Sequence, residues 1–157
     1  MAEMSEGYDE FLESIKNKDL NHDGKIIFLI ICGNSRFYNY GWLEEQLEQW
    51  VKFNGYPDVV ILGGASGVDA LAERWADNQA IPLRVFSEMW ASPRPDQVED
   101  SGRPGAGEIL GVTMMKYATH MLAFPGPESV WTKWMIDFAE SHGVSTAVID
   151  LPMGAED

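Results

Sequence analysis

Hydrophobic positions along the chain follow two alternating patterns. Short apolar runs rich in β-branched residues alternate with longer segments in which apolar residues recur every three or four positions. The longest run, residues 26–32 (IIFLIIC), is apolar at every position, as expected for a strand that is covered on both faces of a parallel sheet. The predicted strands are residues 25–32, 58–62, 82–86, 119–124 and 145–150.

The segments between the runs have the periodicity of amphipathic helices. In residues 40–55, Leu43, Leu47 and Trp50 share helical spacing, and Gly55 follows as a C-cap. The same period indicates helices in three later segments, and a shorter one near the N-terminus. These other predicted helices are residues 8–18, 67–80, 105–118 and 130–143.

Strands that alternate with helices predict βαβ units and therefore a parallel sheet. Because such crossovers are right-handed, helices cover both faces of the sheet. The sequence thus predicts an α/β fold: a single Rossmann-like three-layer domain of about five parallel strands over residues 25–157, preceded by an acidic N-terminal helical extension, residues 1–24. The connection 87–108 is longer than ordinary loops. Its length fits two interpretations, a lid and a disordered segment.

Composition narrows the class of partners. The net charge of −14 argues against a nucleic-acid duplex, because such binding depends on Lys and Arg neutralising phosphates. No apolar run reaches the roughly 20 residues of a membrane helix, and the acidic N-terminus lacks the features of a secretion signal. The single cysteine, Cys32, excludes an internal disulfide. We expect a cytoplasmic protein with no membrane partner.

Candidate binding residues follow the predicted strands, since ligands of open parallel sheets bind outside the carboxyl ends of the strands. Gly, Ser, Thr and Asn there permit close backbone approach and supply hydrogen bonds, and Arg36 offers a planar fork of donors for a phosphate. The candidates on these loops are Gly33, Asn34, Ser35, Arg36, Gly63, Gly64, Ala65, Ser66, Gly67, Asp69, Pro125, Gly126, Ser129 and Thr132.

The segment GGASGVD, residues 63–69, carries the most specific pattern. Its two leading glycines admit a ligand close to the backbone, and Ser66 or Gly67 opens a helix whose first N–H groups are without partners. Asp69 then lies in the first turn, where the helix dipole favours a carboxylate. The segment is neither G-x-G-x-x-G nor a P-loop. A phosphate cradle and a plain strand-to-helix turn both fit it.

Several stretches together resemble one family. They are CGNSRFYNY, VILGGASGVDALAERWA, FSEMW, GAG and AFPGPESVWTKWMIDFAESHGV, which span about residues 26–149. This pattern is similar to the YspA-like branch of the SLOG superfamily, Rossmann-like relatives of the LOG phosphoribohydrolases and of DprA. The resemblance implies a small nucleotide-derived ligand, such as a nucleoside phosphate or an ADP-ribose-type molecule, on the loops named above. It also adds Trp90 to the candidate contacts.

The chain departs from the family pattern at the positions that would carry hydrolysis. Leu110 and Gly111 stand where the family has Arg-Asn, Trp131 stands where it has Gly, and Met135 stands where the LOG enzymes have a catalytic Glu. We therefore assign no catalytic residue and no cofactor, and expect a protein that senses, carries or sequesters its ligand. The alternatives are a nucleotide-processing hydrolase with altered catalytic residues and a non-binding oligomeric scaffold. A homodimer is compatible with the resemblance.

Residues 19–26 (DLNHDGKI) imitate the first half of an EF-hand loop. Asp19, Asn21 and Asp23 have the spacing of its first ligands. The twelfth position, which needs a bidentate Glu, is Ile30 within the longest apolar run. We therefore predict a polar turn between the N-terminal helix and the first strand and assign no metal site, with a weak cation site as the alternative.

Overall fold

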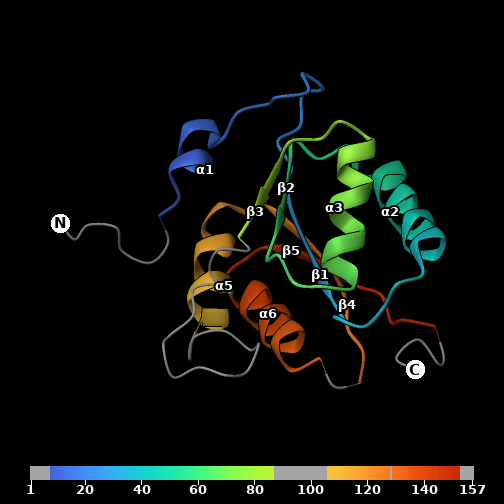
Figure 1. Cartoon of the computed structure of the whole chain (residues 1–157). Coiled ribbons are helices and arrows are strands. Elements are labelled where there is room, and N and C mark those ends of the chain that lie inside the picture. The colour runs from blue at the N-terminus through green and yellow to red at the C-terminus, as the bar shows by residue number, and fades with distance from the viewer. Residues whose placement is uncertain (1–7, 87–105, 128, 153–157) are drawn as a thin grey trace.

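The computed structural model describes residues 8–86, 106–127 and 129–152 (Figure 1). One sheet of five parallel strands has the order β3-β2-β1-β4-β5. The predicted α/β fold with a Rossmann-like strand order is therefore confirmed. The strands are β1 Phe28–Gly33, β2 Val59–Leu62, β3 Leu83–Val85, β4 His120–Phe124 and β5 Ser145–Val148.

Helices cover both faces of this sheet, as the periodicity predicts. Figure 1 shows α2 and α3 on one side and α1, α5 and α6 on the other. Gly55 caps α2 with a φ of +104°, the role expected from its position. The helices are α1 Glu10–Ile15, α2 Tyr40–Asn54, α3 Val68–Asn78, α5 Ala106–Tyr117 and α6 Val130–Ser141.

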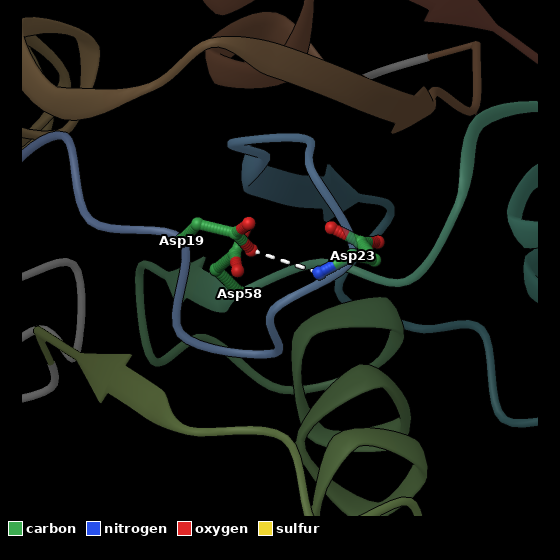
Figure 2. A group of neighbouring side chains, drawn as sticks. All are labelled: Asp19, Asp23 and Asp58. Carbon is green, nitrogen blue, oxygen red and sulfur yellow. Dashed lines mark hydrogen bonds between the residues drawn. The ribbon is translucent and has the colours of Figure 1, made fainter.

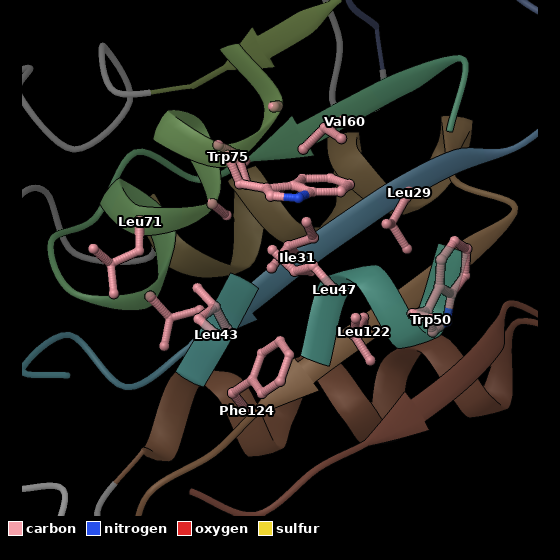
Figure 3. Close-up of a cluster of buried hydrophobic side chains, with 14 of the residues drawn as sticks. Leu29, Ile31, Leu43, Leu47, Trp50, Val60, Leu71, Trp75, Leu122 and Phe124 are labelled. Atoms are coloured by element: carbon pink, nitrogen blue, oxygen red, sulfur yellow. The ribbon is translucent and has the colours of Figure 1, made fainter. Parts of the chain in front are cut away.

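The central strand β1 contributes to two hydrophobic cores. Leu29 and Ile31 face α2 and α3, where they pack in the cluster that contains Leu47 and Trp75 (Figure 3). The alternate residues of β1, such as Ile30, belong to the cluster on the face of α5 and α6. Because successive strand residues point to opposite faces, a strand between two cores is apolar throughout. This explains the uninterrupted apolar run in the sequence.

The first strand starts later than the predicted residue 25, and the cause is a side chain distant in sequence. Asp58 Oδ2 accepts a hydrogen bond of 2.7 Å from the Ile27 N–H, and the Asp58 N–H donates to the Ile27 carbonyl at 2.8 Å. Ile27 is thus paired with the residue before β2, and the ladder begins at Phe28. The predicted strand was wrong at residues 25–27 for this reason, and β5 likewise ends at Val148, two residues before the predicted end.

Helix α1 is attached to the domain by apolar and polar contacts. Leu12 is completely buried in the core on the α5 and α6 face. Asp9 forms an ion pair with Arg84 of β3 at 2.7 Å, and its N–H donates to the Tyr117 hydroxyl at 3.0 Å. That hydroxyl in turn donates to Glu13 at 2.6 Å. The short helix therefore fastens the amino-terminal segment to β3 and α5.

Candidate functional site

Three loops lie side by side at the carboxyl ends of the strands. The first loop (residues 34–39) follows β1, the glycine loop (residues 63–67) follows β2, and the last loop begins at Pro125 after β4. β1 lies between β2 and β4, so its loop has the other two as neighbours. The direction of chain progression also reverses between β1 and β4, which is where open α/β sheets bind ligands.

Asn34 links these loops through its backbone. Its N–H donates to the Phe124 carbonyl at 3.1 Å, and its own carbonyl accepts from the Val68 N–H at 3.0 Å. Its buried side chain accepts from the Arg36 N–H at 2.6 Å. The Val68 N–H was expected to be without a partner at the start of α3, and this contact corrects that expectation. Asn34 therefore organises the first loop and aligns it with α3.

Gly67 is packed against the first loop. Its φ is +70°, which L side chains rarely adopt, and it precedes α3 as the N-cap. A Cβ at this position would overlap the Asn34 carbonyl oxygen and the Ser35 backbone, coming within 2.6 Å of Ser35 Cα. Ser66 adds a hydrogen bond of 2.9 Å from its hydroxyl to the Ser35 carbonyl. The third glycine of the motif thus permits two loops to touch.

Asp69 points back into the protein, toward the glycine loop. It is 2% exposed, and its Oδ2 accepts a hydrogen bond of 3.2 Å from the Ala65 N–H. Burial raises the pKa of Asp69 to about 7, although hydrogen bonds from the backbone of Ala65, Gly63 and Gly64 act to lower it. Asp69, which was predicted in the first turn because the helix dipole favours a carboxylate there, is therefore a buried carboxyl group. It holds the glycine loop, which precedes its own helix.

Apolar side chains from two helices meet Asp69 at Gly63. The Cβ that Gly63 lacks would lie 3.3 Å from Asp69 Oδ2, 3.3 Å from Trp131 Cη2 and 3.4 Å from Leu110 Cδ2. A larger residue would disturb this contact between α3, α5 and α6. Cys32 of β1 is also buried here, and burial, followed by the charge of Asp69, raises the pKa of its thiol well above the usual value. Cys32 is therefore a protonated core residue and not a nucleophile.

The exposed groups of the site are on the first loop and the glycine loop. Ser35, Arg36 and Ser66 are all exposed to solvent. No hydrogen bond or ion pair to the Arg36 guanidinium occurs among the described residues. In a chain this rich in acidic residues, a surface salt bridge is the plain structural role for an exposed arginine, and the described part of the chain provides none for Arg36. The structure therefore places an exposed cation, with no partner among the described residues, on the loop next to the glycine loop.

Hydrogen bonds between Ser129 and Gly126 hold the last loop in a turn. Ser129 Oγ accepts from the Gly126 N–H at 2.8 Å, and the Ser129 N–H donates to the Gly126 carbonyl at 3.2 Å. Ser129 is the N-cap of α6 but makes no side-chain cap hydrogen bond. Pro125 is half-buried and Thr132 is buried in the first turn.

The residues that depart from the family pattern pack between α5 and α6. Leu110 and Met135 are completely buried. A Cβ on Gly111 would overlap the Trp134 ring and lie 2.9 Å from Met135 Sδ, so α5 approaches α6 closely at this glycine. Trp90 and most of the connection 87–108 lie outside the described residues.

A group of three carboxylates lies at the opposite end of the strands, where β1 and β2 begin. Asp19, Asp23 and Asp58 have oxygen atoms within 4.8 Å of one another (Figure 2). Asp19 accepts from the Gly24 N–H at 2.8 Å and from the Asp23 N–H at 3.2 Å, and Asp58 accepts from Asn21 and Ile27. These contacts form the polar turn that the sequence predicts. A cleft of about 630 Å³ next to it includes Tyr56 and Gln79 in its lining.

The strand order, the two helical layers and the three adjoining loops define a Rossmann-like α/β domain. Within it, residues 28–92 match the model of a family described as YspA, cpYpsA-related SLOG family. This match confirms the resemblance over those residues, which include the first loop and the glycine loop but not the last loop. No curated protein and no solved structure matches the chain. None of the described helices is long and apolar enough to cross a membrane.

Proposed function

We propose that the protein binds a small nucleotide-derived anion, such as a nucleoside phosphate or an ADP-ribose-type molecule, at the carboxyl ends of β1, β2 and β4. The observation that carries the proposal is the exposed guanidinium of Arg36, which has no partner among the described residues although acidic residues outnumber basic ones by 25 to 11 in this chain. It stands on a loop that is hydrogen-bonded to the glycine loop. The SLOG match is consistent with a nucleotide-related role.

The chemistry of the loops suits a phosphate group. A guanidinium binds two phosphate oxygens through parallel N–H donors. The first turn of α6, where Ser129 makes no side-chain cap hydrogen bond, adds the positive end of the helix dipole next to the last loop. Leu110 and Met135 replace the polar residues of the LOG enzymes with buried apolar side chains, which supports binding without hydrolysis. We propose that the protein senses, carries or sequesters its ligand.

A thermal-shift series with AMP, ADP, NAD and ADP-ribose tests the proposal. A ligand at 100 times its Kd stabilises the native state by about 2.7 kcal/mol, which is a rise in Tm of roughly 5–10 °C for a chain of this size. No rise with any of these compounds would contradict the proposed function. For a compound that binds, chromatography after incubation distinguishes the alternatives, because a binding protein leaves it intact and a hydrolase releases the base.

Arg36→Ala is expected to weaken binding of the best of these compounds by roughly 10- to 100-fold, since a hydrogen bond to a charged group contributes about 1.5–3 kcal/mol. Stability should change by less than about 0.5 kcal/mol, because the side chain is exposed. Arg74→Ala is the matched control: it removes the same charge from an exposed residue of α3 that is stacked on Tyr40. Titration calorimetry gives both Kd values, and equal Kd values for the two variants would show that the site lies elsewhere.

A further inference from the structure

Asp69 and an anionic ligand would compete for the glycine loop. The Asp69 carboxylate already accepts the Ala65 N–H at 3.2 Å, and the backbone of Gly63 and Gly64 also interacts with it. A phosphate on this loop would bring a second negative charge to the same backbone groups. Two anions at one site in a poorly solvated environment repel each other strongly, and a carboxyl group relieves the repulsion by binding a proton.

We propose that Asp69 is the positioning residue of the glycine loop, and that an anionic ligand docks there together with the uptake of one proton by the Asp69 carboxyl group. This inference rests on the proposed function, and it adds that pH regulates ligand binding at the same site. The proton comes from the solvent and forms an O–H bond on Asp69, so no other reactant is needed. Protonated Asp69 retains a carbonyl oxygen that accepts from the loop.

The surroundings of Asp69 contain no other group that could take the proton or compensate the charge among the described residues. β1 presents the thiol of Cys32, which stays protonated because burial raises its pKa. α5 presents Leu110 and α6 presents Trp131, both of them apolar at the point of contact. The nearest loop cation, Arg36, is exposed and is available to the ligand itself. Burial places the pKa of Asp69 at about 7, so the proton is gained or lost near neutral pH.

ADP-ribose is a suitable probe, because each phosphate of its pyrophosphate carries one ester and one anhydride bond and keeps a single charge between pH 6 and 9, whereas a phosphate monoester itself titrates near pH 6. Titration calorimetry at pH 8 in Tris and in HEPES, which differ in ionisation enthalpy, measures the protons exchanged. We expect uptake of about 0.9 proton per ADP-ribose, since a carboxyl group with a pKa of about 7 is mostly ionised at pH 8. The Kd should rise about tenfold from pH 6 to pH 8.

Asp69→Asn removes the titrating group and keeps an acceptor oxygen for the loop. Its Kd for ADP-ribose should be independent of pH, with no proton uptake, and at pH 8 it should be about tenfold lower than that of the native protein. Asp77→Asn is the matched control, because it removes the same charge from an exposed residue of the same helix. This variant should keep the pH dependence of the native protein.

The outcomes separate the two proposals. Binding of ADP-ribose with no proton uptake and a constant Kd overturns the role of Asp69 and leaves the proposed function standing. Absence of binding at every pH overturns both. If Asp69→Asn does not fold, a ¹³C NMR titration of the native protein measures the Asp69 carboxyl directly. Its pKa should move from about 7 to above 9 when ADP-ribose is added, and an unchanged pKa overturns the inference.

Discussion

Gly67→Ala is expected to lower the free energy of unfolding by about 4 kcal/mol or more, an exceptional loss for one added methyl group. Two effects add at this position. The backbone has a φ of +70° and a ψ of −126°, a region that only glycine visits readily. The new Cβ would also overlap the Asn34 carbonyl oxygen and the Ser35 backbone, which are not flexible side-chain ends. The first loop would have to move away from α3.

Gly143→Ala separates the two effects. Gly143 has a similar φ of +75°, but no atom lies within 4 Å of the position that its Cβ would take. This control should therefore lose only the conformational part, roughly 1–2 kcal/mol. Urea denaturation of both variants gives the free energies of unfolding. Equal losses for the two variants would mean that the first loop and the glycine loop do not pack as described.

The native protein is expected to lose roughly 2–3 kcal/mol of stability through Asp69 as the pH rises from 5 to 8. Burial raises the pKa of this carboxyl from 3.8 to about 7 in the folded state. Between these values the folded protein holds a proton that the unfolded chain has released. The contribution of Asp69 is therefore complete below pH 3.8 and disappears as the pH passes through 7.

Asp69→Asn isolates this effect, because its stability should not decline in the same interval. Burial lowers the pKa of His120, so His120 makes the native protein more stable as the pH rises toward 6.5, which opposes the trend from Asp69. His120 is present in both proteins, and the difference between their unfolding free energies cancels its contribution. That difference should change by roughly 2–3 kcal/mol between pH 5 and 8. A difference that is constant with pH would rule out a buried, titrating Asp69.

The elements of the fold could be predicted because their signals are local. Leu43, Leu47 and Trp50 repeat at helical spacing, and all three are buried on one side of α2. The start of β1 could not be predicted, because it depends on a hydrogen bond between Ile27 and Asp58, 31 positions apart. Composition gives no sign of such a pairing.

The sequence could predict which loops form the candidate site, but not the role of each residue on them. The strand ends indicated where the glycine loop lies, since that follows from the topology of a parallel sheet. Whether Asp69 faces the solvent or its own loop depends on which side chains fill the space beside it. Leu110 and Trp131, which meet it at Gly63, come from helices that are distant in the sequence. The buried placement of Asp69 is therefore a property of the tertiary structure.

The most direct test of a binding site at the carboxyl ends of the strands is an amide NMR titration with ADP-ribose. The account predicts that the largest shifts occur in the first loop, the glycine loop and the first turn of α6. The cleft at the opposite end of the strands, which includes Tyr56 and Gln79, serves as the internal control and should show no shift. Shifts centred on that cleft, with the glycine loop unperturbed, would contradict the account.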